Sequence, residues 1–282
     1  DGACPAPGPT VDCIPADADT HAIGTVVADD DGTLWLGSGD GFYWEDGPFE
    51  TVRTGNPDSL AGKILHVDRD GNGLPGHALC PSSPLTDNCA TVFALGFRNP
   101  FRFVPRDDGK VVVGDVGNSV WEELNIARPG GDYGWPCYEG DDRTEGFSLL
   151  PECQPWYARE GTAQASLGPA WKYRHEQNPH LGGSIIAGPQ YDGDAYPAGY
   201  RGTWFVGDYV RNWVQRVTIT DETVSSPTPF IEDARFVTLD EDPDGNLVLV
   251  SVGFGGDGEG AVERVVYTPG NAAPVVSASG NP

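Results

Sequence analysis

The feature that most constrains this chain is a hairpin unit that recurs along it, in which an acidic turn ending in glycine separates two apolar runs. Three copies align on that turn glycine and span residues 21–40, 98–117 and 234–253, and a looser fourth spans Ile185–Val210. An Asp-Gly turn between apolar runs is a strong local signal for an antiparallel hairpin. Repeated antiparallel units separated by long polar loops predict a β-propeller.

Composition agrees with an all-β chain. The 282 residues include 39 glycines and 25 prolines, which suit many short strands and tight turns. No window longer than about ten residues shows a clean helical period of apolar residues. An all-β propeller is therefore the predicted fold. A two-sheet sandwich is the alternative, although its turns usually follow one another at closer spacing.

The turn of each unit also predicts which residues face each other at the open end of the hairpin. The predicted pairs are His21 with Asp40, Arg98 with Gly117, and Ala234 with Gly253, the last beside Arg235. Equivalent ends of propeller blades converge around the axis. These residues are therefore the predicted site, because binding groups usually lie in loops at the ends of strands.

His21 and Asp40 match a general base held by a carboxylate, which fixes the imidazole tautomer and stabilises the imidazolium. A hydrogen-bonded structural histidine at a strand end is the alternative. Arg98, followed by Asn99, offers a planar donor fork that suits carboxylates. An ordinary surface ion pair is the alternative for this arginine.

Two stretches have the oxygen-rich character of calcium sites. In the first, Gly117 and Asn118 offer backbone carbonyls and Glu123 a carboxylate, with a simple turn as the alternative. The second is the run Asp68-Arg-Asp70-Gly-Asn72-Gly, in which acidic or amide side chains alternate as at the start of a calcium loop. It lacks the closing glutamate, and a plain Asp-Gly-Asn-Gly turn is the equal alternative.

The chain is strongly acidic. Its 17 basic and 42 acidic residues give a net charge of −25. Nucleic acid and anionic membranes would be repelled, so neither is expected as a partner. No apolar run in the sequence is long enough to cross a membrane, so insertion is not expected either. The charge suits bound cations, although an acidic secreted protein without a cation function is the more common case.

The cysteines and the chain ends predict the compartment and the domain organisation. Six cysteines allow 15 pairings, and we expect the short-range ones, Cys4 with Cys13, Cys80 with Cys89, and Cys137 with Cys153. Disulfides form in oxidising compartments, so the protein is predicted to be secreted. We expect an N-terminal arm closed by a disulfide at residues 1–20 and a propeller at 21–268. A Pro/Ala/Ser linker at 269–282 is expected to lead to a further module.

Several motifs give the chain a family resemblance: SLAGKILHVDRDGNGLPG, ALGFRNPFRF, GDVGNSVWEELN, GGDYGWPCYEG and YPAGYRGTWFVGDY. From Ala18 to Thr268 the chain resembles the glucose/sorbosone dehydrogenase family, in its secreted actinobacterial form. These are six-bladed propellers that use pyrroloquinoline quinone (PQQ) and calcium. The resemblance implies further blades before the first hairpin, so the propeller is expected to be incomplete at its N-terminus.

The resemblance also implies roles for individual residues. His21 matches the base that takes the proton of the sugar's anomeric hydroxyl while hydride passes to the quinone, and Asp40 matches its acidic partner. The remaining matches hold cofactor and metal: Arg98, Asn99 and Arg235 for the quinone, the carbonyls of Gly117 and Asn118 for its calcium, and Glu123 with the Tyr133 carbonyl for a further calcium.

Three positions depart from the family pattern. Val116 stands where a glutamine is expected, Asp192 where a lysine is expected, and Val237 where a second arginine is expected. Each lost charge-assisted contact is worth roughly 1.5–3 kcal/mol. Together the departures predict cofactor binding that is weaker by a few orders of magnitude.

The hypothesis that follows is a secreted, calcium-binding dehydrogenase that oxidises an aldose with PQQ and passes the electrons to a separate acceptor. The alternative, which the departures favour, is a non-catalytic, calcium-stabilised propeller that binds glycans or a partner protein at the same open ends of the hairpins, here called the mouth. A third reading is a hydrolase that uses His21 and paired acids, for which the sequence offers no apparent nucleophile.

Overall fold

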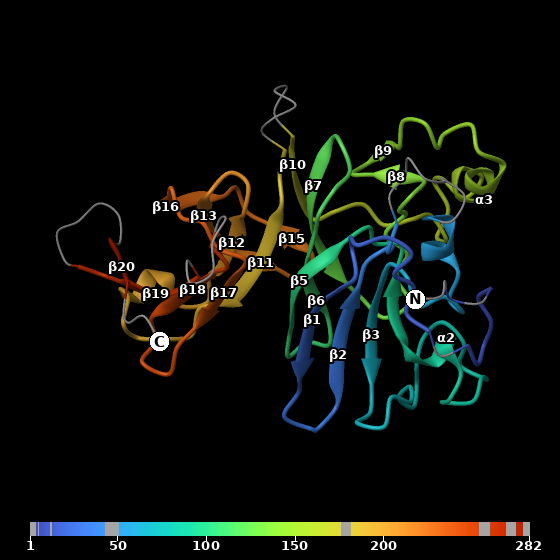
Figure 1. Cartoon of the computed structure of the whole chain (residues 1–282), viewed down its shortest axis with the longest axis horizontal. Helices are drawn as coiled ribbons and strands as arrows, with labels where there is room; N and C mark the ends of the chain where they lie inside the picture. Colours follow the sequence, from blue (N-terminus) through green and yellow to red (C-terminus); the bar gives the residue numbers. More distant parts are fainter. Residues whose placement is uncertain are drawn as a thin grey trace. The chain divides into compact units, whose positions relative to one another are not determined.

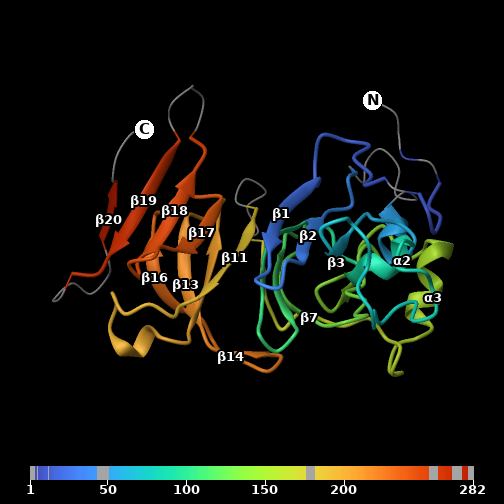
Figure 2. The same cartoon turned by 90° about the horizontal axis from the view of Figure 1, so that it is seen from below.

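The computed structural model describes residues 4, 6–11, 13–42, 51–175, 182–253, 260–268 and 275–278. The chain divides into two compact units, Asp1–Tyr173 and Arg174–Pro282, drawn in Figures 1 and 2. Each unit is built mainly from two four-stranded antiparallel sheets. The predicted all-β class is confirmed, and the helices among the described residues are only three or four residues long.

In the first unit, the strands of each sheet lie side by side in chain order. The first sheet contains β1 (Ile23–Ala28), β2 (Leu34–Ser38), β3 (Lys63–Val67) and β4 (Val92–Leu95). The second contains β5 (Pro100–Pro105), β6 (Val111–Asp115), β7 (Trp121–Ala127) and β10 (Trp171–Arg174). The short helices η2 (Val52–Gly55) and α2 (Asn88–Thr91) lie in loops of the first sheet.

Between β7 and β10 lies a segment of about forty residues with little regular structure, here called the excursion. This excursion carries the hairpin β8 (Tyr138–Glu139) and β9 (Asp142–Arg143), followed by η3 (Pro151–Cys153) and α3 (Gln154–Tyr157). Long loops with little regular structure are often functional in compact domains. This one contributes directly to the site described below.

The second unit repeats the same plan. Its first sheet contains β11 (Ile185–Gln190), β12 (Trp204–Asp208), β13 (Trp213–Val217) and β16 (Thr228–Glu232). Its second contains β17 (Thr238–Glu241), β18 (Leu247–Ser251), β19 (Ala261–Val266) and β20 (Val275–Ala278), seen in this order in Figure 2. The short helix η4 (Ala198–Tyr200) and the hairpin β14 (Ile219–Thr220) with β15 (Thr223–Val224) complete it.

Each four-stranded sheet is an up-and-down meander, which is the structure of a propeller blade. The four predicted repeat units form the first two strands of the four sheets, so the predicted propeller is confirmed at the level of its blades. Residues 275–278, predicted to belong to a linker, instead form β20 and pair with β19. The remaining domain boundaries stay predictions.

The pairing predicted from the turns is one residue out along the strands and correct at the open ends of the first two hairpins only. In the first hairpin Ala28 pairs with Leu34, and a β-bulge after Ile23 then brings Ile23 opposite Ser38. The second hairpin has the same irregularity, which brings Pro100 opposite Asp115. A bulge adds one residue to one strand and so corrects the offset. In the third hairpin the offset persists through the pairs from Thr238 to Glu241.

The predicted turn glycines and disulfides are confirmed. Gly32, Gly109 and Gly245 have φ values of 84°, 78° and 78°, a left-handed conformation that glycine adopts without steric cost. The disulfides join the three short-range pairs, Cys4–Cys13, Cys80–Cys89 and Cys137–Cys153. Each unit also has its own apolar core, with Ile64 and Phe97 at the centre of the first and Phe205 and Phe236 in the second.

We predict that Gly24→Ala destabilises the first unit, because β1 approaches β5 closely at this residue. A Cβ atom at Gly24 would lie 2.5 Å from the carbonyl oxygen and 2.8 Å from the Cα of Phe101. Overpacking of this kind costs about 1–3 kcal/mol. Denaturant unfolding measures the loss, with Gly199→Ala as the control because a Cβ there meets no atom within 4 Å. Equal stabilities of the two variants would contradict the close approach.

Candidate active site

The site begins at the open end of the first hairpin, where His21 and Asp40 meet. The imidazole Nδ1 lies 2.7 Å from Asp40 Oδ1, and the two side chains are 12% and 1% exposed. The bulge in β1 and the closeness of Gly39 permit this contact, since a Cβ at Gly39 would lie 2.3 Å from the His21 carbonyl oxygen. His21 itself has a φ of 46°, a strained value of the kind that clusters at functional sites.

Asp40 is held by groups from several distant segments. The indole Nε1 of Trp135 donates to its second carboxylate oxygen at 2.9 Å. The backbone of Asp40 donates to the carbonyl of Arg98 at 2.8 Å, and its own carbonyl accepts from Arg53 at 2.8 Å. A buried carboxylate needs such bonds to offset its lost hydration. The sequence analysis missed this role of Trp135, because no local pattern links it to Asp40.

Arg98 and Asn99 lie beside this pair, at the start of the second hairpin. The Nη1 of Arg98 donates to the carbonyls of Val116 and Gly117 at 3.0 and 2.6 Å. The guanidinium carbon lies 5.6 Å from the centroid of the Trp135 ring, a cation–π contact. The structure thus brings the predicted residues His21, Asp40, Arg98, Asn99 and Gly117 into one neighbourhood.

The turn at Arg98 and Asn99 is fixed by a buried acid, Asp115. Its two carboxylate oxygens accept the backbone N–H groups of Arg98 and Asn99 at 3.0 and 2.7 Å. Burial raises the pKa of Asp115 well above its ordinary value, and the neighbouring Glu123 raises it further. The carboxyl group therefore acts mainly as a hydrogen-bond anchor for the turn.

The loop that follows Gly117 is organised by Glu139, a residue that the sequence analysis did not single out. One carboxylate oxygen of Glu139, which is 3% exposed, accepts four consecutive backbone N–H groups. The donors are Asn118 at 2.9 Å, Ser119 at 2.8 Å, Val120 at 2.8 Å and Trp121 at 3.1 Å. Only tertiary structure reveals this contact, because β8 and the loop are separated by the whole of β7.

Glu123 and Tyr133, the predicted second metal site, are both buried. Glu123 accepts from the backbone of Gly140 at 2.5 Å and from the side-chain amide of Asn125 at 3.1 Å. Burial raises the pKa of Glu123 to about 7. The Tyr133 ring packs in the core and its hydroxyl donates to the carbonyl of Ile126 at 2.7 Å. The metal role of these two residues stays a prediction.

The run 68–72 forms a turn in which Asp68 accepts the backbone N–H groups of Asp70 and Asn72 at 2.9 and 2.8 Å. The run 242–246 has the same Asp, Gly and Asn positions, and Asp242 accepts the same two bonds within it. The pattern is therefore a turn signature in this chain. This geometry favours the plain turn, and calcium binding there stays a prediction.

The described residues contain no group of three or more His, Cys, Asp or Glu side chains placed to hold a metal ion. The calcium predicted at the mouth would be held by the carbonyls of Gly117 and Asn118, and that role stays a prediction. The carbonyls of Val116 and Gly117 converge on one positively charged atom, the Nη1 of Arg98. The same arginine offers a donor fork for the carboxylates of a quinone cofactor.

Arg235 belongs to the second unit, in the segment between β16 and β17, where it is exposed. Of the departures in that unit, Asp192 is exposed and donates its backbone N–H to Glu241 at 3.0 Å, and Val237 is half-buried. The predicted cofactor role of Arg235 stays a prediction, because the residues brought together above all belong to the first unit.

Lys63 lies fully buried near the open end of β3. Its Nζ donates to the carbonyls of Thr54 and Ala61, both at 2.6 Å. Burial lowers the pKa of this lysine to about 7. Thr54 in turn donates its hydroxyl to the carbonyl of Trp135 at 2.5 Å, so Lys63 supports the segment that carries Trp135.

The blades and the histidine–carboxylate pair at their mouth define a β-propeller with a candidate acid–base site. The chain belongs to the glucose/sorbosone dehydrogenase family, whose model matches residues 11–259. It is 32% identical over 207 residues to the HIPL2 protein of Arabidopsis thaliana, covering 67% of this chain and 28% of that protein. The chain thus spans under a third of the length of this curated relative.

Solved structures share the fold. The PQQ-bound aldose sugar dehydrogenase of Streptomyces coelicolor matches with a TM-score of 0.61 and 21% identity, covering 89% of this chain and 63% of that chain. The apo form of the soluble aldose sugar dehydrogenase of Escherichia coli matches with a TM-score of 0.58 and 19% identity, covering 80% and 59%. At these identities the likeness establishes the fold alone.

We predict that Lys63 makes the free energy of unfolding rise with pH above neutrality. The folded state releases the lysine proton near pH 7 and the unfolded state near its ordinary value of 10.5. Between those values the unfolded state binds more protons, so stability rises with pH. Relative to Lys63→Met the slope approaches about 1.4 kcal/mol per pH unit.

Denaturant titrations at several pH values from about 7 to about 9 measure this slope. Lys110→Met, at the turn of the second hairpin, serves as the control and should leave the slope of the wild type unchanged. If the wild type and Lys63→Met ran parallel over this range, the lysine would be charged in the folded state and the prediction would be wrong.

Proposed function

We propose that this chain is the catalytic propeller of a quinoprotein-type oxidoreductase that oxidises the anomeric hydroxyl of an aldose. The observation that carries the proposal is the pair of His21 and Asp40 at a blade mouth, 2.7 Å apart and next to Arg98. Membership of the glucose/sorbosone dehydrogenase family supports it. The PQQ-bound dehydrogenase from Streptomyces coelicolor supports the choice of cofactor.

In this proposal His21 is the general base. Asp40 binds its Nδ1, which leaves Nε2 for the substrate: no described residue is hydrogen-bonded to that atom. The anomeric O–H proton passes to Nε2 and the C–H hydrogen leaves with its electron pair, so that the aldose becomes a lactone. The negative charge of Asp40 stabilises the imidazolium that forms. PQQ, when bound, supplies the two-electron acceptor for this hydride.

Arg98 and Asn99 are proposed to hold the quinone, and the family resemblance alone proposes a cofactor role for Arg235. The carbonyls of Gly117 and Asn118 would hold its calcium, and the Glu123 carboxylate with the Tyr133 carbonyl would hold a second ion. Arg98 presents a donor fork to the carboxylates of the cofactor, and a cation could use the carbonyls of Val116 and Gly117 only if Arg98 gave up its two hydrogen bonds to them.

The three disulfides indicate an oxidising compartment, and we propose a secreted enzyme of the actinobacterial type. Among the described residues no helix has the length and apolar character needed to cross a membrane. The proposed partners are a sugar substrate and a separate electron acceptor.

A second candidate, a non-catalytic calcium-stabilised propeller that binds glycans or a partner protein, is favoured by two features. Arg98 is already satisfied by the loop carbonyls, and Asp192 places a negative charge where the family has a lysine. Both features oppose the binding of a cofactor with several carboxylates.

The test is a calorimetric titration of the calcium-loaded protein with PQQ, alongside an aldose assay read with a reducible dye. We expect PQQ to bind and the dye to be reduced only in the presence of sugar. His21→Ala should abolish reduction because it removes the base, with PQQ binding close to that of the wild type, and it should lower the unfolding midpoint because buried Asp40 loses its 2.7 Å partner. Absence of PQQ binding at high micromolar concentration would favour the second candidate.

A further inference from the structure

One short segment reaches both halves of the candidate site. Residues 131–140, here called the GWP turn, follow β7 and include Trp135, Cys137 and Glu139. Trp135 donates to Asp40 of the His21–Asp40 pair, and Glu139 accepts from the loop 118–121. Cys137, which lies between them in the sequence, forms a disulfide with Cys153. The three residues stand at every second position of this short segment, so a displacement of the turn would move both contacts together.

The Trp135 half of the turn is firmly held. Its indole donates to Asp40 at 2.9 Å, its ring lies beneath the Arg98 guanidinium, and its backbone N–H donates to Gly96 at 2.9 Å. Thr54 donates to its carbonyl at 2.5 Å. Trp135 is 4% exposed, so its ring position is fixed by packing as well. The indole thus orients Asp40 through its N–H group and presents its ring face to the Arg98 guanidinium.

The Glu139 half fixes the loop. Four N–H groups on one buried carboxylate oxygen form an anion-binding nest, which is costly to break because the charge would be left unsatisfied. The carbonyls of Val116 and Gly117 come immediately before the first of these donors. The carboxylate therefore determines where the proposed calcium oxygens point without touching the ion.

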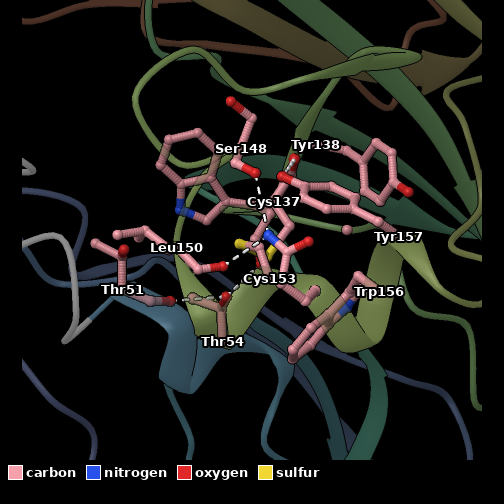
Figure 3. Close-up of a disulfide and its surroundings, with 12 residues drawn as sticks. Thr51, Thr54, Cys137, Tyr138, Ser148, Leu150, Cys153, Trp156 and Tyr157 are labelled. Atoms are coloured by element: carbon pink, nitrogen blue, oxygen red, sulfur yellow. Dashed lines mark hydrogen bonds between the residues drawn. A yellow bond between two sulfur atoms is a disulfide. The ribbon is translucent and has the colours of Figure 1, made fainter.

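The disulfide lies between the two halves and is fully buried, with both cysteines 0% exposed. Figure 3 shows Cys137 and Cys153 among Leu150, Trp156 and Tyr157. The hydroxyl of Tyr157 donates to the Cys137 carbonyl at 3.0 Å, and so does the backbone N–H of Thr144. These contacts join the GWP turn to η3 and α3, which anchors it in the excursion between β7 and β10.

We propose that the GWP turn, fixed by the Cys137–Cys153 disulfide, is a positioning element. It holds the His21–Asp40 pair through Trp135 and the loop 118–121 through Glu139. The roles of those two targets rest on the proposed function, whereas the mechanical coupling does not. Trp135 and Glu139 are positioning residues in this proposal, since each acts through another group. The disulfide is the shared support.

The first experiment compares two double variants by nuclear magnetic resonance of the protein without cofactor. In Cys137→Ala/Cys153→Ala we expect the amide protons of residues 118–121 to exchange at least about tenfold faster and the Trp135 indole signal to shift, because both contacts loosen. Cys80→Ala/Cys89→Ala removes a disulfide that makes no contact with the site among those described. It should leave these signals and exchange rates unchanged, even where it lowers the unfolding midpoint.

Equal effects of the two double variants would overturn the proposal, because the disulfide would then stabilise the fold in general. Unchanged exchange at residues 118–121 in the first variant would overturn it as well. If Cys137→Ala/Cys153→Ala fails to fold, single substitutions that keep the disulfide carry the test, and they separate the two halves.

Trp135→Phe keeps an aromatic ring, although a smaller one, and removes the N–H donor to Asp40. We expect the ring signals of His21 to change and the exchange of residues 118–121 to stay as in the wild type. Glu139→Ala should do the reverse, and Glu139→Gln should restore part of the protection because its amide oxygen can still accept. A protein in which Glu139→Ala leaves this protection intact would contradict the role of the nest.

These readouts need neither quinone nor turnover, so their failure is distinct from a failure of the proposed function. If the dehydrogenase proposal holds, Trp135→Phe should also lower kcat with little change in KM for the sugar, because the base is misoriented while the sugar still binds. If PQQ does not bind, the resonance experiments still decide whether the GWP turn positions the mouth.

Discussion

The structure of the mouth depends on one buried carboxylate, Asp40. It accepts from His21 and Trp135 through its side chain, and through its backbone it is bonded to Arg98 and Arg53. Removing a carboxylate from water costs several kcal/mol unless hydrogen bonds compensate it, so these segments cannot separate without exposing or neutralising the group. The first hairpin, the second hairpin and the GWP turn are therefore joined at one charge.

The same solution recurs at other acids near the mouth. Asp115 anchors the turn at Arg98 and Asn99 through two backbone N–H groups, and Glu139 anchors the next loop through four. In both cases a side chain supplies the acceptor for backbone donors that no strand can satisfy, which is a requirement for buried polar groups. The acids thus convert irregular loops into fixed geometry, and fixed loops are what a cofactor site needs.

Burial favours the neutral form of two carboxyl groups near the mouth. Burial raises the pKa of both Asp115 and Glu123, and a neutral carboxyl group can hold a loop without repelling its neighbours. Arg98 contributes the main positive charge among the groups described there, and it binds loop carbonyls as well as covering Trp135. The mouth is therefore more permissive to an anionic cofactor than the net charge of the chain indicates.

Sequence alone determined the fold class, the four hairpins and the turn glycines, because turns and alternating strands are set by neighbouring residues. It predicted, without excluding the alternatives, the short-range disulfides and the meeting of His21 with Asp40. It placed the strand pairs one residue out, because the predicted centre of each turn differs from the centre that the observed pairs define. Only tertiary structure decided that Trp135 completes the Asp40 site and that Glu139 holds the loop 118–121. Those contacts join segments that are distant in the chain, and no local pattern encodes the distance between them.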